Sequence, residues 1–316
     1  MRLTRSPLAL ALAASVALSP VLAGAAEYIN ILTGGQSGVY YPLGVAIEKL
    51  VAETMPDATP SVQATKASVE NLNLLQEGRG ELAFTLGDSL ALAWAGDTEA
   101  GFKGKLDKLR TVGAIYPNYV QIVASKESGI ATLADLEGKR LSVGAPRSGT
   151  ELNARAILGA AGIAYDDLGK VEYLPFAESV ELMKNRQLDA TLQSAGLGVA
   201  SIRDLASSIE IVVVEIPAEI VEKVGQPYRT ATIPAGTYQG QDADVATAAV
   251  QNFLVTHEGV PEETVYAMTK AIFDNLDALV SAHAAAKDIS LDEAAANPPV
   301  PLHPGAEKYF REKGTM

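Results

Sequence analysis

The chain has no cysteine among its 316 residues, which excludes disulfides, thiolate metal sites and cysteine nucleophiles. Its three histidines, His257, His283 and His303, come late in the sequence and lack the spacing of metal ligands. We expect them to be surface or packing residues. A Gly-x-x-x-x-Gly-Lys phosphate loop is missing, and no Gly-x-Gly-x-x-Gly turn follows the first strand. We therefore expect no cofactor, no metal and no catalytic residue.

Basic residues are scarce relative to acidic ones, and the net charge is −13. Such an acidic chain argues against binding to nucleic acid or to anionic lipid. A local cluster of N–H groups can still outweigh a distant, screened surface charge. An anionic small molecule therefore stays open as a ligand.

Long hydrophobic runs are absent after the first 25 residues, and crossing a bilayer takes about 20 such residues. Residues 1–25 have the features of a signal peptide: a positive start, the apolar stretch Leu8–Leu18, and the small-residue pattern Ala23–Ala25. The alternative is an uncleaved anchor or a buried helix. We expect cleavage near Ala25, which leaves a periplasmic protein of charge −15 with no cysteine for a lipid anchor.

Strand-like and helix-like segments alternate along the mature chain, which predicts the α/β class. Residues 109–116 and 119–125 are expected as two strands, and residues 245–257 as one long strand. The segments 119–125 and 228–233 bracket a second α/β set and are expected to cross between two lobes. We therefore expect lobe 1 to comprise residues 26–118 plus 230–316, and lobe 2 residues 119–229, with a hinged cleft between them.

The most informative segment is the glycine-rich turn Gly34–Pro42, which follows an apolar strand and leads into a helix. Unpaired N–H groups and the positive end of the helix dipole meet there, and both favour an anion. Residues 144–151 form a second such turn, with Ser148 and Glu151 at the spacing of a capping box. Two such turns, one in each lobe, are expected to hold a small acid between them.

At this point the sequence resembles the TAXI-type solute-binding proteins, the extracytoplasmic receptors of one class of TRAP transporter. The resemblance runs in order through Gly34–Pro42, Ala64–Asn71, Glu81–Ser89, Leu136–Pro146, Ser148–Glu151, Tyr173–Glu178, Ile233–Tyr238 and Val300–Ala306. It implies a two-lobed periplasmic binding protein fold of type II-like form. It also implies capture of a small organic anion, such as glutamate or 2-oxoglutarate, for a permease driven by an ion gradient.

One residue departs from that pattern. Arg147 stands where the family usually has a glycine before Ser148. Its cation is expected either to add charge-assisted hydrogen bonds to an anion or to point into solvent.

The expected ligand-binding residues flank the turns and strand ends that face the cleft. They are Ser37, Gly38, Tyr40, Tyr41, Thr65, Ser68, Asn71, Asp88, Ser89, Tyr116, Arg147, Ser148, Gly149, Thr150, Gln193, Ser194 and Gly196. Some have structural alternatives: the tyrosines as interface core, Ser37 as a turn residue, and Ser68 and Asp88 as helix caps.

The function expected from these residues is solute binding by closure of the cleft, in a monomer that works with TRAP permease subunits. One alternative is a receptor that presents its ligand to a membrane sensor kinase. The other is a hydrolase, which would need a Gly-x-Ser-x-Gly elbow and a histidine. Gly35-Gln36-Ser37-Gly38 does not match that elbow.

Overall fold

The computed structural model describes residues 27–316, so the expected signal peptide and its cleavage site lie outside the described residues. Strands and helices alternate through this part of the chain, which confirms the α/β class. The strands are β1 (Glu27–Leu32), β2 (Ala58–Gln63), β3 (Leu82–Leu86), β4 (Leu109–Ser125), β5 (Arg140–Ser142), β6 (Lys170–Glu172), β7 (Ala190–Ala195), β8 (Ile211–Val214), β9 (Arg229–Ile233) and β10 (Val245–His257). The α-helices are α1 (Tyr40–Thr54), α2 (Ser68–Gln76), α3 (Gly87–Ala95), α4 (Gly149–Ala160), α5 (Phe176–Lys184), α6 (Ala200–Ser208), α7 (Ala218–Val224), α8 (Glu262–Phe273), α9 (Leu276–Ala282) and α10 (Pro304–Lys313).

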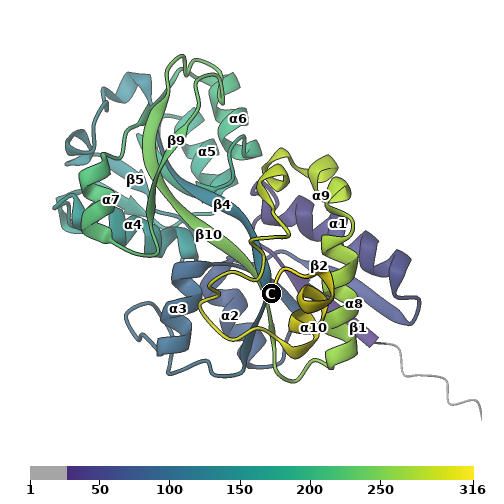
Figure 1. Cartoon of the computed structure of the whole chain (residues 1–316). Coiled ribbons are helices and arrows are strands. Elements are labelled where there is room, and N and C mark those ends of the chain that lie inside the picture. Colours follow the sequence, from purple (N-terminus) through teal and green to yellow (C-terminus); the bar gives the residue numbers. More distant parts are fainter. Residues whose placement is uncertain (1–26) are drawn as a thin grey trace, which may run out of the picture.

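The strands form one continuous sheet in the order β2-β1-β3-β10-β4-β7-β5-β6, with β8 on β4 and β9 on β10. Figure 1 shows two groups of elements joined by β4 and β10. We call β1 to β3 with α1 to α3 and α8 to α10 the first lobe, and β5 to β9 with α4 to α7 the second lobe. The chain thus has the two-lobed architecture expected from its sequence.

The two lobes are joined by long antiparallel strands. β4 has 17 residues and β10 has 13, and they pair from Ala249 opposite Tyr119 to His257 opposite Leu109. The expectation of two separate strands over 109–116 and 119–125 is therefore wrong. Pro117 suggested a break, but it lies opposite Gln251, where the register shifts between Gln251 and Phe253. A bulge accommodates a proline because the ladder hydrogen bond is already lost there.

Burial explains why these segments fold as they do. All five residues of β3 are buried, as expected for a strand covered on both faces, whereas β2 at the sheet edge alternates partly buried and exposed positions. In α1, Leu43, Ile47, Leu50 and Val51 recur at helical spacing and pack into a core that also includes second-lobe residues such as Met183 and Leu205. A further core lies mainly in the second lobe, where Ile157 and Leu158 of α4 pack with Leu192 of β7.

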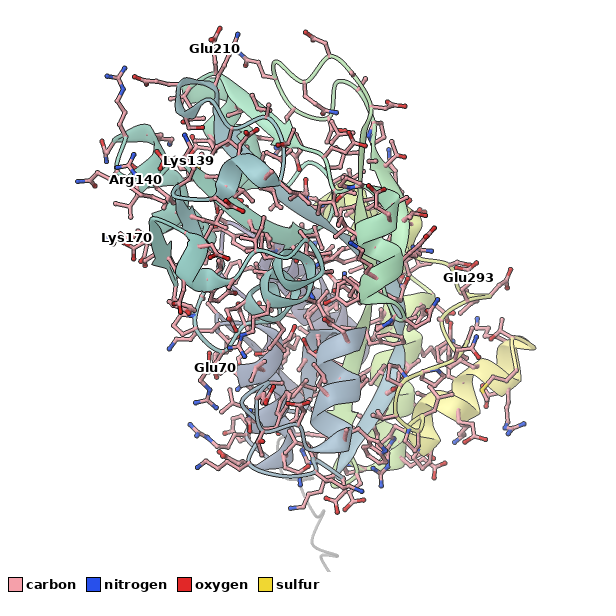
Figure 2. The ribbon with its side chains drawn as sticks, turned by 90° about the vertical axis from the view of Figure 1, so that its left-hand side faces the viewer. Glu70, Lys139, Arg140, Lys170, Glu210 and Glu293 are labelled. Atoms are coloured by element: carbon pink, nitrogen blue, oxygen red, sulfur yellow. The ribbon has the colours of Figure 1, made fainter. Side chains whose placement is uncertain are left out.

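A partly exposed ion pair lies at the edge of the second-lobe sheet. The guanidinium of Arg140 at the start of β5 contacts both carboxylate oxygens of Asp189, at 2.6 and 3.0 Å. Figure 2 shows Arg140 beside Lys139 and Lys170 on the outer side of this lobe, with Glu70 of the first lobe lower on the same side. Exposed pairs of this kind contribute little on their own, roughly 0 to 1 kcal/mol.

The parallel strands of both lobes end at the cleft. β1 and β3 lead into α1 and α3, while β5 and β7 are followed by the turns before α4 and α6. Ligands of open α/β sheets bind at such carboxyl ends. In the described part of the chain, no helix combines the length and apolar character that a bilayer crossing requires.

Candidate ligand-binding site

A cavity of about 140 Å³ lies between the lobes at these strand ends. Its lining comes from both lobes: Gly34, Gly35, Gly38, Val39, Tyr40, Thr65, Lys66, Ala67, Ser68, Leu86, Tyr116, Asn118, Ala145, Ser148, Gly149, Thr150, Pro175, Phe176, Ser194 and Ala195. A ligand held here would touch both halves of the molecule at once.

About half of the expected binding residues line this cavity. These are Gly38, Tyr40, Thr65, Ser68, Tyr116, Ser148, Gly149, Thr150 and Ser194. The others, which are outside the lining, are Ser37, Tyr41, Asn71, Asp88, Ser89, Arg147, Gln193 and Gly196. Most of the latter are next to a lining residue, so their role in binding stays a prediction.

Two residues outside the lining have structural partners instead. The amide of Asn71 is fully buried and donates to the carbonyls of Thr33 and Phe84 at 2.7 and 2.9 Å. The side-chain oxygen of Gln193 accepts from Ser201 at 2.6 Å. Both side chains therefore fix strand ends and helix starts next to the cavity.

Several lining residues were not expected from the sequence. Asn118 lies in the part of β4 that was read as a break between two strands. Pro175 and Phe176 follow β6 and open α5, so they reach the cavity as another strand end. Their only sequence signal was their place in the segment Tyr173–Glu178 of the family resemblance.

The first-lobe wall is built around the N-terminus of α1. The ring of Tyr40 stacks on Phe84 of β3, with centroids 5.0 Å apart, and its hydroxyl donates to the side-chain oxygen of Asn252. Tyr40 is thus both interface core, as one alternative proposed, and a lining residue. Ala67, just before α2, has a φ of +69°, a conformation that costs a non-glycine residue free energy. Such strain persists where the surrounding structure enforces it, here at the cavity wall.

Ser68, in the same wall, does not have the role of helix cap that the sequence suggested. α2 begins at Ser68 itself, and its N-cap residue is Ala67, which offers no side-chain cap. The hydroxyl oxygen of Ser68 instead accepts from the amide of Leu86, at 3.1 Å. Ser68 therefore joins α2 to the end of β3 and is not a helix cap. Nor is Asp88 an N-cap, because α3 begins at Gly87 with Leu86 as its N-cap.

The second-lobe wall is built around the start of α4. The oxygen of Ser148 accepts from the amide of Glu151 at 3.2 Å, which confirms Ser148 as the helix cap. The carboxylate of Glu151 does not return to Ser148 but pairs with Arg155 at 2.7 Å. Only one half of the expected capping box therefore forms.

Arg147 adopts a φ of +64°, in the left-handed region that favours glycine. This explains physically why a glycine suits the position. Its carbonyl accepts from the amide of Glu70 in the first lobe at 3.2 Å, and the residue is exposed. The backbone of Arg147 therefore joins the two lobes at the rim of the cavity.

The lobes approach closely at Gly149. A Cβ atom placed there would lie 2.6 Å from both Leu86 and the hydroxyl of Ser68, and 2.9 Å from the hydroxyl of Ser89. All three belong to the first lobe. Glycine is thus required at this position for the lobes to meet as they do in this structure.

A series of hydrogen bonds between buried amide and hydroxyl side chains lies behind the cavity. Asn252 of β10 donates to Asn118 at 2.7 Å, and Asn118 donates to the carbonyl of Ser194 at 2.9 Å. The hydroxyl of Ser194 donates to Asn153 of α4 at 2.6 Å. These hydrogen bonds connect the start of α4 with β4 and β10, the two strands that join the lobes.

This series of hydrogen bonds ends at a buried carboxylate between the lobes. Asp88, which is 5% exposed, accepts through one oxygen from Asn153 and from the hydroxyl of Tyr228, both at 2.6 Å. Its other oxygen accepts from the amide of Ser89 at 2.6 Å. Burial raises the pKa of Asp88, and these hydrogen bonds act in the opposite direction. Asp88 from the first lobe is therefore held by two side chains of the second.

Among the described residues, one polar side-chain atom of the lining is both fully buried and without a hydrogen-bond partner. The hydroxyl of Tyr116, a fully buried residue of β4, makes no hydrogen bond to any described residue. Burial raises the pKa of Tyr116, so it is a neutral donor. An unpaired buried hydroxyl is costly unless a bound molecule satisfies it.

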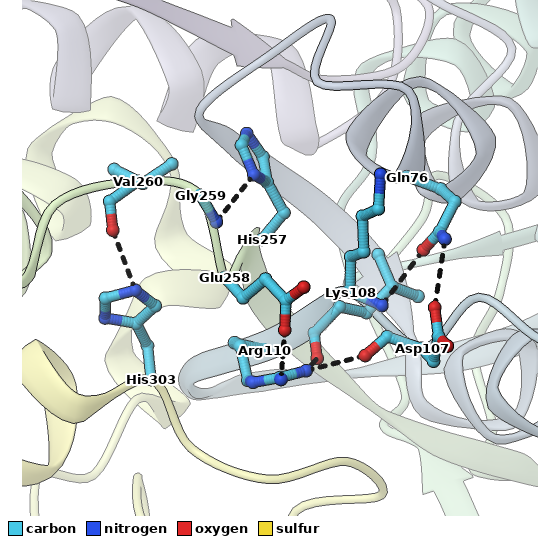
Figure 3. A network of polar contacts seen from close by, with 10 residues as sticks. Gln76, Asp107, Lys108, Arg110, His257, Glu258, Gly259, Val260 and His303 are labelled. Carbon is cyan, nitrogen blue, oxygen red and sulfur yellow. Dashed lines mark hydrogen bonds and ion pairs between the residues drawn. The ribbon is translucent and has the colours of Figure 1, made fainter.

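The histidines take no part in the cavity. The ring of His303 caps α10 through the amide of Gly305 and bonds the carbonyl of Val260, at 3.2 and 3.0 Å. His257 accepts from the amide of Gly259 at 3.1 Å, in a polar network at the far end of the first lobe (Figure 3). His283 accepts from the amide of Ala285. All three therefore have local structural partners, as the sequence indicated.

Comparison with known proteins agrees with this geometry. PhnD1 from Prochlorococcus marinus, solved in complex with methylphosphonate, aligns with a TM-score of 0.59 at 12% identity, over 92% of this chain and 99% of that one. A protein described as a periplasmic transporter aligns at 0.58 and 12% identity, over 93% and 95%. A putative L-cystine ABC transporter from Listeria monocytogenes aligns at 0.52 and 13% identity, over 85% and 98%.

At these identities the structural similarity shows the fold, which is that of two-lobed periplasmic binding proteins. The sequence itself matches the profile of the NMT1-like family over residues 31–314. That match spans nearly all of the described chain and includes every segment that lines the cavity. The chain therefore belongs to the NMT1-like family.

Proposed function

We propose that the protein is a periplasmic solute receptor that captures a small organic anion by closure of its two lobes. The observation that carries this proposal is the cavity lined by both lobes at the carboxyl ends of their strands. A ligand that touches both walls stabilises the closed form by its difference in affinity for the two forms.

The preference for an anion rests on the walls of the cavity. The first turns of α1 and α4 open at it, and the amides of a first helical turn have no carbonyl partner within their own helix. Lys66 lies at the rim, is exposed, and lines the same cavity. Methylphosphonate, the ligand named for the Prochlorococcus marinus protein of the same fold, is also a small anion.

We further propose that the receptor serves a TRAP transporter of the TAXI type and delivers its ligand to an ion-gradient-driven permease. The support is the sequence resemblance, which includes residues of both cavity walls. One solved protein of this fold is described as an ABC transporter component, so the transport partner has to be tested directly. Glutamate and 2-oxoglutarate are the reference ligands, the mature protein is expected to be a monomer, and it is expected to have no enzymatic activity.

The lobe boundaries are part of this proposal. From the sequence, we expected the lobe boundaries between residues 118 and 119 and between residues 229 and 230. β9 (Arg229–Ile233), however, pairs with Val245–Ala249 at the start of β10, beside other second-lobe strands. We therefore propose that the second lobe extends to about residue 249.

The proposal is tested with the mature protein, residues 27–316, screened by calorimetry and thermal shift against small organic acids and size-matched neutral polyols. We expect one or more acids to raise Tm by mass action on the folded state, and the polyols to have no effect. Mass spectrometry of small molecules that copurify with the protein identifies the natural ligand. Binding of a polyol or another neutral solute in place of every acid would refute the proposal.

A second arm tests the transport partner. The permease genes adjacent to this gene would be deleted and uptake of the bound acid measured. Loss of uptake on deletion of an ion-driven permease supports the TRAP assignment. Uptake that depends on an ATPase instead would refute it.

A further inference from the structure

The polar groups that line the cavity are mainly hydrogen-bond donors. In the first lobe, the hydroxyl oxygen of Ser68 already accepts from Leu86, so Ser68 can act only as a donor, with the Tyr40 oxygen also within its reach. The hydroxyl of Tyr116 has no partner among residues 27–316. Lys66 adds an ammonium group, which can only donate.

The second-lobe wall has the same character. The oxygen of Ser148 is occupied as an acceptor by the amide of Glu151, so its proton is also available. The amides of Gly149 and Thr150 belong to the first turn of α4, where no preceding helical carbonyl can accept them. Both walls therefore present N–H and O–H groups to the enclosed space.

Two side-chain acceptors of the lining are already used by the protein, and the hydroxyl of Ser194, which donates to Asn153, keeps only a neutral oxygen. The side-chain oxygen of Asn118 accepts from Asn252 at 2.7 Å, and the oxygen of Thr65 accepts from the amide of Ala67 at 2.9 Å. No aspartate or glutamate is among the residues that line the cavity in the described part of the chain.

Two acidic side chains near the cavity, Asp88 and Glu151, are occupied as well. Both oxygens of Asp88 are bound by Asn153, Tyr228 and Ser89, and Asp88 is outside the lining. The carboxylate of Glu151 is held in a two-point contact by Arg155, at 2.7 and 2.9 Å. An ammonium group in the cavity would have no carboxylate to balance its charge, and an unpaired buried charge is strongly unfavourable.

We infer that the ligand is a carboxylic acid whose polar atoms all accept hydrogen bonds, with the Tyr116 hydroxyl donating to one of its oxygens, and that the corresponding amino acid is rejected. A 2-oxo acid is the simplest compound of this kind, because replacing the amino group by a carbonyl turns a charged donor into an acceptor. This inference rests on the proposed function, and it separates the two reference ligands, glutamate and 2-oxoglutarate.

The inference is tested with pairs of acids that share a carbon skeleton, so that the unknown chain length does not matter. The pairs are 2-oxoglutarate with L-glutamate, pyruvate with L-alanine, and 2-oxoisocaproate with L-leucine, each measured by calorimetry on residues 27–316. In the pair whose skeleton fits, we expect the 2-oxo acid to bind roughly 100-fold more tightly or better, because the ammonium is left unpaired. An amino acid that binds as tightly as its partner would overturn the inference and leave the proposed function standing.

A variant tests the donor itself. Tyr116→Phe removes the unpartnered hydroxyl, so the ligand-free protein should have an unchanged or higher Tm. Affinity for the bound acid should fall about tenfold to 100-fold, as for a hydrogen bond to a charged acceptor. Tyr119→Phe, three residues along β4 and outside the cavity, is the matched control and should bind normally.

The outcomes separate the two proposals. Unchanged affinity in Tyr116→Phe would overturn the inference, because the hydroxyl would then not face the ligand. If no acid of either class binds and a neutral molecule copurifies, the proposed function fails and the inference fails with it.

Discussion

Removing the Tyr228 hydroxyl should weaken ligand binding although Tyr228 does not line the cavity. This hydroxyl donates to Asp88 at 2.6 Å and accepts from Asn153 at 2.7 Å. Tyr228 and Asn153 belong to the second lobe and Asp88 to the first, so the contact with the carboxylate exists only when the lobes meet. Tyr228→Phe keeps the ring, which is 7% exposed and packs in the second-lobe core, and deletes only the hydroxyl.

The magnitude follows from the type of bond. A buried hydrogen bond to a charged group contributes about 1.5 to 3 kcal/mol, and each 1.4 kcal/mol is a factor of ten in an equilibrium constant. Because this loss affects the closed form alone, affinity for the bound acid should fall roughly 10- to 150-fold. Calorimetry measures this loss, and small-angle scattering should show a more open molecule at equal ligand concentration.

Tyr309→Phe is the matched control. The Tyr309 hydroxyl also donates to a carboxylate, that of Asp274 at 2.8 Å, but both residues belong to the first lobe. We expect this variant to lower Tm while leaving affinity unchanged. Equal affinity in Tyr228→Phe and Tyr309→Phe would refute the idea that the Asp88 contact holds the lobes together.

The remaining predictions concern the rim, the lobe contact and pH. Gly149→Ala should abolish ligand binding and leave the Tm of the ligand-free protein nearly unchanged, because its methyl group would meet Leu86 and Ser68 only on closure. Gly159→Ala in the same helix has open space around it and should bind the ligand normally. Similar affinity in both variants would disprove the contact. Lys66→Gln should lower the association rate of the anionic ligand several-fold at low ionic strength, and this difference should disappear at high salt. Lys103→Gln, away from the cavity, should not change the association rate. Stopped-flow measurements in which the two variants behave alike would contradict this prediction. Burial raises the pKa of Asp88 above its ordinary value, so the folded protein holds this proton more tightly than the unfolded chain does. Tm should therefore be highest below the unfolded-state pKa of Asp88 and decline as pH rises through its folded-state pKa. Thermal melts across pH should show this decline in the wild type and a flatter profile in Asp88→Asn, and the same decline in both would assign it to another group.

The parts of the fold and site that follow from local sequence could be predicted. The turns before α1 and α4 were identified because glycine, proline and a capping serine act within a few residues. The same holds for Val245–His257, a strand that is rich in apolar residues and contains no proline or glycine.

The parts that depend on distant contacts could not be predicted. Asp88 was expected to face a ligand, but its partners Asn153 and Tyr228 are 65 and 140 residues away in the sequence. Ser68 was expected to cap its own helix, whereas it bonds the amide of Leu86 across the lobe. Asn118 was missed because Pro117 suggested a break, which the register shift opposite Gln251 accommodates.

The pairing of β4 with β10 has a mechanical consequence. Two adjacent hydrogen-bonded strands can twist and flex as a unit, but they cannot slide past each other without losing their ladder. The shifts after Gln251 and Leu254 are the places where this ladder is already interrupted, so bending concentrates there. The two lobes should thus open and close along a single path, which is set by the bending of this strand pair. A substitution that straightens these bulges would then change the affinity for the solute without altering a residue of the cavity lining.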